Sequence, residues 1–453
     1  MSTAAKQAES ATRVAFVGAG PGDPGLLTMR AAQLLAEADV VVLDQLCREQ
    51  FVASLVSDGV EFVDGGYGEA GTELTNASRA KLLVKAAKAA TEGHDDGRAL
   101  VVRLMDGDPA TFHGLAEEAG ACAKAGIEFE IVPGVSAVSA VPAYAGVPLT
   151  DSKARNIHVV TAGDPKVDWA RSIDACTTVV VLGQADLLRD SLVELRAAGR
   201  RGNTPVALTQ NGTTITQETT TLTLDEVPAA LRRAEFDGPV MAIVGSTVGH
   251  RAALSWWENK PLFGWKVLVP RTKEQSGSMT RRLTEYGASS AIVPTISVEP
   301  PRTPAQMEKA VKGLVTGRYE WVGFTSVNAV RAVREKFAEF GLDVRAFAGL
   351  KIAAVGGVTA DALREWGIEP DLMPSGEQSA KGLLEVWPDY DEQLDPINRV
   401  FLPRADIATE NLVAGLIDLG WECDDVTAYR TVRAAPPPAP TRDAIKSGKF
   451  DAV

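Results

Sequence analysis

A glycine-rich turn near the N-terminus is the first stretch whose residue types and spacing could serve a ligand. In VAFVGAGPGDPGLLT, the β-branched and aromatic run Val14–Val17 predicts a strand, and three glycines follow at alternate positions from Gly18. Glycine adopts backbone angles that other residues avoid and lets a ligand approach the main chain closely. Asp23 is typical of a helix N-cap, with Pro24 at the first helical position. A strand, a glycine turn and a helix in this order form a place where ligands bind in open α/β folds.

The spacing of these glycines does not match a dinucleotide-binding fingerprint. A GxGxxG motif that starts at Gly18 requires glycine at position 23, where the chain has Asp23. Pro21 also removes a backbone amide that a pyrophosphate turn could use. These two residues oppose a nucleotide-dependent oxidoreductase. A turn without any ligand is the alternative, and it would be favoured if the stretch stood alone.

Four further motifs follow the glycine turn in a fixed order. They are VVLDQL at 41–46, RLMDGDP at 103–109, VPGVSAVSAVPAYAGVPLT at 132–150 and QNGTT at 210–214. Over about residues 14–257 the series resembles the uroporphyrinogen-III C-methyltransferases, a family of tetrapyrrole methylases. The resemblance implies S-adenosyl-L-methionine as cofactor, small-molecule tetrapyrrole substrates and a homodimer.

The resemblance also implies which residues act. Asp44, after a buried strand, matches the family's proton acceptor; capping of the next turn is the structural alternative. We expect Asp108 to accept hydrogen bonds from the cofactor, and Gly107 and Gly134 to leave room for its adenosine, with turn geometry as the alternative for the glycines. The implied cofactor contacts are Pro21, Asp106, Gly107, Asp108, Thr111, Ser136, Ala137, Leu182 and Gly212.

Several cations of the family pattern are missing from this chain. Gly66 stands where the family has a lysine assigned as proton donor, and Met105 replaces another lysine. FHGL at 112–115 replaces an arginine- and glycine-rich turn, and PLTDSK at 148–153 lacks the usual His-Arg pair. Uroporphyrinogen is rich in carboxylates, so these losses affect its binding more than that of the cofactor. They support an alternative in which the first half binds S-adenosylmethionine or a tetrapyrrole without catalysis, as a scaffold or sensor.

The first half of the chain has the alternation of strands and helices that predicts α/β layers. Candidate strands fall into a first group from VAFVG to EFEIVP and a second group from NIHVVTAG to PVMAIVGS. We expect a methyltransferase domain at 13–254, with subdomains at about 13–145 and 150–254 and a hinge near 142–155. SWWENKPLFGW at 255–265 interrupts the pattern and predicts a linker, with a buried tryptophan loop as the alternative.

The second half contains an internal repeat. VLVPRTKEQSGSMTRRLTEYGA at 267–288 has the same shape as VFLPRADIATENLVAGLIDLGW at 400–421, so that Arg271 corresponds to Arg404 and Gly287 to Gly420. Each copy predicts a strand, Pro-Arg, an amphipathic helix, glycine and a second strand.

The repeat units and VGFTSVNAV, KIAAVGGVTADALREWGI and VTAYRTV resemble uroporphyrinogen-III synthase over about 266–453. The resemblance implies a two-subdomain α/β fold, with one subdomain at about 301–427. The other would combine 266–297 with residues from about 434 onward. Since the repeat predicts a further segment after Val453, we expect this domain to be truncated at its C-terminus.

The synthase resemblance implies a reaction controlled by positioning, in which hydroxymethylbilane is folded and closed with inversion of its last ring. We expect Tyr429 to assist loss of the hydroxyl group. The expected substrate contacts are Arg271, Thr325, Ser326 and Arg404. The alternatives are a core aromatic for Tyr429, ordinary N-caps for the hydroxyl residues and surface salt bridges for the arginines.

Composition excludes several other function classes. The 453 residues carry a net charge of −13, which disfavours nucleic acid and anionic membrane surfaces as partners. No apolar run approaches the length of a membrane helix, and MSTAAKQAESAT lacks the apolar core of an export signal. The four cysteines, at positions 47, 122, 176 and 423, have neither disulfide nor zinc spacing, so we expect no metal and a cytoplasmic location.

Together these features predict a fused enzyme of haem, sirohaem and cobalamin precursor synthesis. The second half would make uroporphyrinogen III, and the first would methylate it to precorrin-2. The main alternative is a uroporphyrinogen-III synthase with a non-catalytic N-terminal module.

Overall fold

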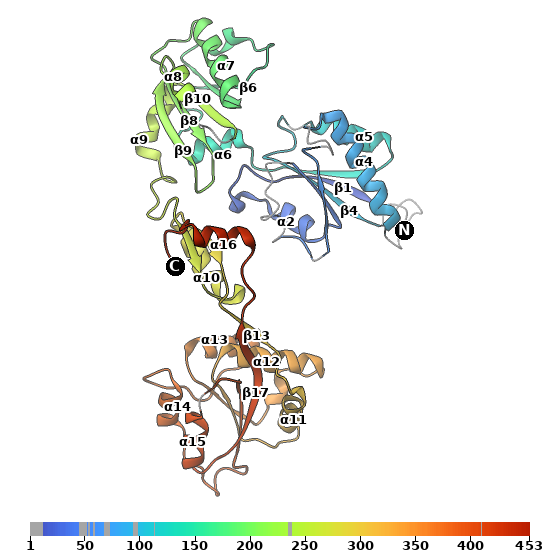
Figure 1. Cartoon of the computed structure of the whole chain (residues 1–453), viewed down its shortest axis with the longest axis vertical. Coiled ribbons are helices and arrows are strands. Elements are labelled where there is room, and N and C mark those ends of the chain that lie inside the picture. The colour runs from blue at the N-terminus through green and yellow to red at the C-terminus, as the bar shows by residue number, and fades with distance from the viewer. Residues whose placement is uncertain are drawn as a thin grey trace. The chain divides into compact units, whose positions relative to one another are not determined.

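The chain divides into two compact units in the computed structural model (Figure 1). One contains residues 1–265 and 282–289, and the other contains 266–281 and 290–453. The structure describes residues 12–44, 52, 55–57, 59–67, 73–93, 98–112, 114–233, 238–408 and 410–453. No helix in these ranges has both the length and the apolar character needed to cross a membrane.

The first unit begins with a parallel five-stranded sheet in the order β3-β2-β4-β1-β5. Helix α2 (Met29–Ala36) packs on one face, and α4 (Asn76–Gly93) and α5 (Leu115–Lys124) pack on the other (Figure 1). Burial on both faces explains the nearly continuous apolar runs in the central strands. The five expected strands are confirmed as β1 (Arg13–Gly18), β2 (Val40–Leu43), β3 (Glu61–Asp64), β4 (Leu100–Met105) and β5 (Glu128–Val132).

A second, mixed sheet follows in the order β6-β7-β10-β8-β9, in which β6 and β7 are parallel and the other neighbours are antiparallel. Helix α6 (Ala137–Tyr144) packs on one face, and α7 (Ala185–Ala197) and α8 (Val227–Arg233) lie on the other. The sequence analysis missed β9, whose threonine-rich ETTTLT lacks apolar alternation. The strands are β6 (Asn156–Thr161), β7 (Thr177–Gly183), β8 (Pro205–Gln210), β9 (Glu218–Thr223) and β10 (Val240–Val244).

The segment expected to be a linker packs firmly on the first unit. It follows the short helix α9 (Arg251–Leu254). Trp257 is 4% exposed, and its indole N–H donates to the carbonyl of Thr214 at 2.9 Å. The indole of Trp256 donates to the carbonyl of Ala143 at 3.0 Å. The segment therefore leads to the second unit, but it also has the buried tryptophan considered as the alternative.

A small sheet of β11 (Lys266–Val269) and β12 (Ser289–Ile292) is connected by helix α10 (Lys273–Glu285), and most of these residues belong to the second unit. After helix α16 (Ala439–Lys446), the chain returns to this sheet, where Ala452 pairs with Val267 in parallel. The amide of Leu268 donates to the carbonyl of Ala452 at 2.8 Å. Residues near the end of this segment thus lie beside β11, as the synthase resemblance implied.

The larger sheet of this unit has the order β13-β17-β16-β14-β15, with β13 antiparallel and the other strands parallel. Helices α11 (Pro304–Val315), α12 (Val327–Glu339) and α13 (Gly357–Trp366) cover one face, and α14 (Ala380–Val386) and α15 (Asn411–Asp418) cover the other. The strands are β13 (Ile296–Glu299), β14 (Trp321–Phe324), β15 (Lys351–Ala354), β16 (Arg399–Ala405) and β17 (Glu422–Arg433).

The internal repeat is confirmed at the level of elements. In the first copy α10 connects β11 to β12, and in the second α15 connects β16 to β17. Gly287 and Gly420 follow these helices with φ of 93° and 91°. Glycine is favoured at this place because a left-handed residue ends the helix without a Cβ clash.

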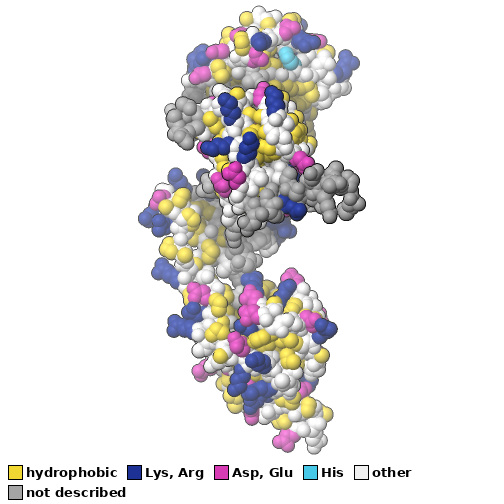
Figure 2. Space-filling view, turned by 90° about the vertical axis from the view of Figure 1, so that its right-hand side faces the viewer, with side chains coloured by type: hydrophobic (Ala, Val, Ile, Leu, Met, Phe, Trp, Pro, Cys, Tyr) yellow, Lys and Arg dark blue, Asp and Glu magenta, His cyan; other side chains and the backbone are white. Residues whose placement is uncertain are grey.

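The surface drawn in Figure 2 has acidic and basic side chains interspersed with apolar ones over both units. The acidic side chains that outnumber the basic ones in the chain are thus not gathered in one patch on that face.

Candidate active sites

The loops that follow β1, β4 and β5 meet at the carboxyl edge of the first sheet. Gly20 and Gly107 exchange backbone hydrogen bonds of 3.1 and 2.9 Å. A Cβ on Gly18 would lie 2.4 Å from the Cα of Gly134, and one on Gly134 would lie 2.0 Å from the carbonyl oxygen of Gly107. Close approach of three backbones therefore requires glycine here. The turn-geometry alternative explains these residues without invoking space for adenosine.

Asp108 holds these loops together. Its Oδ1 accepts from the backbone amide of Ala110 at 2.8 Å and lies 3.4 Å from the hydroxyl of Thr111. Its Oδ2 accepts from the amide of Gly134 at 3.0 Å. The carboxylate therefore shapes the loop, and its oxygens, each with two lone pairs, keep the capacity to accept a further hydrogen bond.

The second sheet contributes to the same region. The backbone amide of Asp23 donates to the hydroxyl of Thr213 at 3.1 Å. A Cβ on Gly212 would lie 2.5 Å from a methyl group of Val141 on α6, and Leu182 packs against the cluster that contains Val141. Ser136 begins α6, and its hydroxyl accepts from the amide of Val138 at 3.2 Å. The QNGTT loop and α6 are thus joined to the glycine turn.

The expected cofactor contacts are brought into this region and share one property. All of them except the buried Gly107 are half-buried, as expected for residues that line an accessible surface and unlike the strand residues beneath them. The half-buried members are Pro21, Asp106, Asp108, Thr111, Ser136, Ala137, Leu182 and Gly212.

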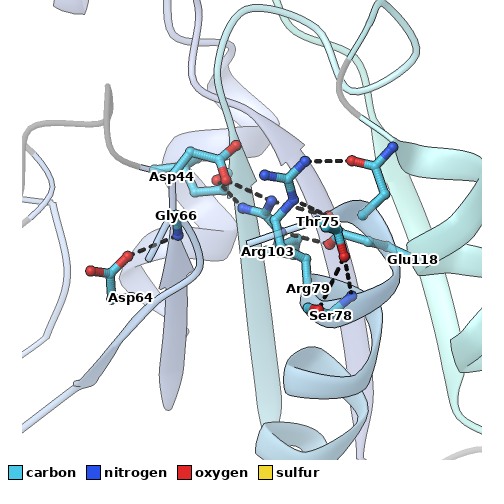
Figure 3. Close-up of polar contacts among 10 residues, drawn as sticks. Asp44, Asp64, Gly66, Thr75, Ser78, Arg79, Arg103 and Glu118 are labelled. Carbon is cyan, nitrogen blue, oxygen red and sulfur yellow. Dashed lines mark hydrogen bonds and ion pairs between the residues drawn. The ribbon is translucent and has the colours of Figure 1, made fainter. Parts of the chain in front are cut away.

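Asp44 lies at the carboxyl end of β2 beside a buried arginine (Figure 3). Nη2 of Arg103 donates to Oδ1 of Asp44 at 2.7 Å. The side chain of Arg103 is 1% exposed and that of Asp44 is 15% exposed. The Asp44 carboxylate is therefore partly accessible to solvent, and the buried Arg103 is its counter-ion.

A second carboxylate holds the other side of Arg103. Its Nε and Nη2 donate to Glu118 on α5 at 2.7 and 3.1 Å, and its Nη1 donates to the carbonyl of Leu104 at 2.9 Å. Burial disfavours the charged guanidinium, but hydrogen bonding and charge from Glu118 and Asp44 outweigh it and raise the pKa of Arg103. Burial and the charge of Glu118 raise the pKa of Cys122 to about 11.

Arg79 on α4 completes this group, with Nε 3.5 Å from Oε1 of Glu118 (Figure 3). The group thus contains two carboxylates and two guanidiniums, so its formal charges balance. The sequence analysis missed Arg79, Arg103 and Glu118. A signal was available, because an arginine inside the apolar strand ALVVRL is rarely buried unless it is paired.

The described residues of the turn after β3, 65–67, carry no cationic side chain. The amides of Gly66 and Tyr67 donate to Oδ1 of Asp64 at 2.8 and 3.0 Å, which closes the turn on itself. The position of the family's lysine is thus part of a compact backbone turn beside Asp44 (Figure 3).

In the second unit, Tyr429 on β17 is 7% exposed and belongs to the core of the larger sheet. Its hydroxyl lies 3.0 Å from that of Ser326. Ser326 is the N-cap of α12, and its hydroxyl also accepts from the amide of Ala329 at 3.1 Å. The half-buried Thr325 precedes it. The structure therefore brings Tyr429, Ser326 and Thr325 together at the start of one helix.

The two arginines expected to bind substrate lie in different environments. Arg404 is 4% exposed and donates from Nε to Asp425 at 2.8 Å, with a second contact from Nη2. Its guanidinium thus forms the salt bridge considered as the alternative, with a buried arginine and a partly exposed carboxylate. Arg271 follows β11 and is exposed.

Two protein families match this chain, one in each half. Residues 13–228 match the tetrapyrrole (corrin/porphyrin) methylases, and residues 277–453 match the uroporphyrinogen-III synthase HemD family. The porphyrin biosynthesis protein HemD of Ruminiclostridium josui is 30% identical over 427 residues, which cover 92% of this chain and 81% of that protein.

Other relatives match the first half. The S-adenosyl-L-methionine-dependent uroporphyrinogen III methyltransferase of Methanosarcina barkeri is 34% identical over 52% of this chain and 92% of its own length. The siroheme synthase of Methylococcus capsulatus is 37% identical over 54% of this chain, which spans about half (52%) of that protein.

Proposed function

The chain belongs to the family in which a tetrapyrrole methylase is fused to a uroporphyrinogen-III synthase, and from this membership we propose that it catalyses two consecutive steps of tetrapyrrole biosynthesis. The synthase half closes hydroxymethylbilane to uroporphyrinogen III. The methylase half transfers methyl groups from S-adenosylmethionine to uroporphyrinogen III and forms precorrin-2. In this proposal the methylase domain comprises residues 13–254. The linker comprises residues 255–265, and the synthase domain comprises residues 266–453.

The observation that carries the methylase proposal is the ion pair between Asp44 and the buried Arg103 at the edge where the glycine loops meet. Methylation of a ring carbon must be followed by loss of a proton, and a carboxylate that stays ionised can accept it. Arg103 holds the Asp44 carboxylate by a hydrogen bond and an ion pair, and the partial exposure of Asp44 leaves it accessible to a substrate.

The residues at the loop junction fit S-adenosylmethionine. Its methionine and adenosine parts would be held by half-buried residues from both sheets, including Pro21, Thr111, Ser136, Ala137 and Leu182. When bound, the cofactor supplies a methyl group on a positively charged sulfur. The paired backbones at Gly20 and Gly107 keep the two loops in one arrangement, so little ordering is needed on binding.

In the synthase half, the start of α12 suits the carboxylates of a linear tetrapyrrole, because backbone amides at a helix N-terminus attract anions. Thr325 and Ser326 lie at this helix start, and the hydroxyl of Tyr429 lies beside them. Tyr429 assists departure of the substrate hydroxyl as a proton donor, and Arg271 is the exposed cation available to a carboxylate.

The second candidate is a synthase whose first half binds its ligands without catalysis. The closed turn at Gly66, which replaces a family lysine, favours it. Methyl-labelled S-adenosylmethionine and uroporphyrinogen III separate the two, since only a methylase transfers label to the tetrapyrrole. Binding of both ligands without label transfer would support the alternative in which the first half is a non-catalytic scaffold. Formation of uroporphyrinogen III from hydroxymethylbilane tests the second half separately.

We further propose that the protein is a homodimer. We also propose that it is located in the cytoplasm, which is a reducing compartment. The cysteines within the described ranges, Cys122, Cys176 and Cys423, are free thiols, which suits a reducing compartment.

A further inference from the structure

The methylase half contains a buried group of charges in which Arg103, the partner of Asp44, is also bound by Glu118. We propose that Arg103, held in place by Glu118, is a positioning residue that fixes the Asp44 carboxylate for proton acceptance during methyl transfer. This inference rests on the proposed methylase function and names the residue that orients its base.

The geometry gives Arg103 little freedom. Its guanidinium donates to Asp44, to both oxygens of Glu118 and to the carbonyl of Leu104. The planar fork of arginine is suited to such paired contacts, and lysine cannot reproduce them. Because Arg103 lies on a central strand and Glu118 on the helix that covers it, both supports belong to the rigid part of the subdomain.

The three side chains of this group differ in how deeply they are buried. Glu118 is fully buried, Arg103 is 1% exposed and Asp44 is 15% exposed. The charged group thus becomes more accessible from α5 towards the end of β2. Asp44 is held by its Oδ1 from the protein side, so its accessible part faces away from the core.

Other charged and titratable groups around Asp44 define what each variant should do. Arg79 comes from α4, Glu118 and Cys122 come from α5, and Asp64 ends the neighbouring β3. Glu118 competes with Asp44 for the same guanidinium. Loss of the Glu118 charge should therefore strengthen the hold of Arg103 on Asp44, whereas loss of Arg103 should remove it.

The first test compares the full-length parent with Arg103→Met/Glu118→Leu, which replaces the buried pair by apolar side chains and removes one charge of each sign, so that Asp44 and Arg79 remain and the group stays neutral. We expect this variant to bind S-adenosylmethionine and uroporphyrinogen III as the parent does. Its kcat for methyl transfer should fall about 100-fold, since a displaced catalytic group costs that much.

The second test separates kcat from KM. Arg103→Lys retains the charge of Arg103 but loses the planar fork, so it should lower kcat for methyl transfer and leave the KM for both ligands unchanged. A purely structural role would lower stability without this separation of kcat from KM.

Arg200→Met is the matched control. Arg200 is also a buried arginine of this unit, and it donates to the carbonyls of Ser172, Asp174 and Thr177 beside the second sheet. It should lower thermal stability without changing kcat or KM for methyl transfer.

An active parent whose kcat for methyl transfer persists in Arg103→Met/Glu118→Leu would overturn the positioning role and leave the proposed function intact. A parent that binds both ligands but transfers no methyl would overturn the proposed function, and the positioning role with it.

Discussion

The hydroxyl of Tyr144 donates a hydrogen bond of 2.7 Å to Oδ2 of Asp23, which joins the end of α6 to the glycine turn. Oδ1 of the same carboxylate accepts from the amide of Gly25 at 2.7 Å and caps a short 3₁₀ helix, Pro24–Leu26. The expected N-cap is thus confirmed, with a shorter helix than the pattern suggested. Burial, together with the hydrogen bond and charge of Asp23, raises the pKa of Tyr144.

Tyr144→Phe tests whether this contact matters for cofactor binding. Loss of the hydrogen bond should reduce the free energy of unfolding by about 1 kcal/mol. It should also weaken S-adenosylmethionine binding, because the glycine turn is no longer tied to α6. Calorimetric titration and urea denaturation measure the two effects. Tyr286→Phe, at an exposed tyrosine, is the control; equal cofactor affinity in both variants would contradict the prediction.

Gly134→Ala should disrupt the meeting point of the three loops. The new Cβ would lie 2.0 Å from the carbonyl oxygen of Gly107, so the backbone must move and cofactor binding should be lost. Gly120→Ala on α5 is a matched control, because its Cβ meets nothing within 4 Å. Removal of a helical glycine there should stabilise the protein by about 0.5–1 kcal/mol. Thermal unfolding and equilibrium dialysis check both variants, and a Gly134→Ala protein that binds normally would refute the packing argument.

Because its thiol is buried, Cys122 should lower the stability of the protein at alkaline pH. Burial and the charge of Glu118 raise the pKa of the Cys122 thiol from its ordinary value to about 11 in the folded state. Below about pH 9 the thiol is protonated in both states, so its effect is constant; above it, the unfolded chain ionises first and stability falls. Cys122→Ala should reduce this fall between about pH 9 and 11 in urea denaturation, whereas the half-buried Cys176→Ala serves as control. A parent-like slope in Cys122→Ala would show that other groups cause the fall.

Substitution of Tyr429 should mainly lower kcat, whereas substitution of Ser326 should mainly lower stability. Tyr429→Phe should lower kcat for hydroxymethylbilane cyclisation by about 100-fold if the hydroxyl donates a proton. Ser326→Ala removes the N-cap of α12 and should cost about 1 kcal/mol of stability, with a smaller effect on kcat. Coupled assays of uroporphyrinogen III formation and denaturation curves separate the two. Tyr390→Phe, in the opposite core of the same sheet, is the control. Normal turnover by Tyr429→Phe would leave Tyr429 as a core aromatic.

Local sequence patterns determined the elements of this protein. Apolar runs such as VVVL and TTVVVLG predicted buried strands, and the glycines at 287 and 420 predicted the ends of two equivalent helices. These signals depend on neighbours along the chain, so they can be read without a fold. The ordered motifs likewise indicated both families, which the matches to each half support.

Tertiary structure alone decided how the charged and glycine residues are used. Asp44 and Arg103 are far apart in sequence and meet because β2 and β4 are neighbours in the sheet. Gly18, Gly107 and Gly134 come from three loops that converge at one sheet edge, and Arg404 is buried because Asp425 lies on the adjacent strand. Such pairings depend on strand order and register, which periodicity along the chain does not encode. The sequence therefore determined which elements form, and the packing of distant elements decided which side chains remain available for chemistry.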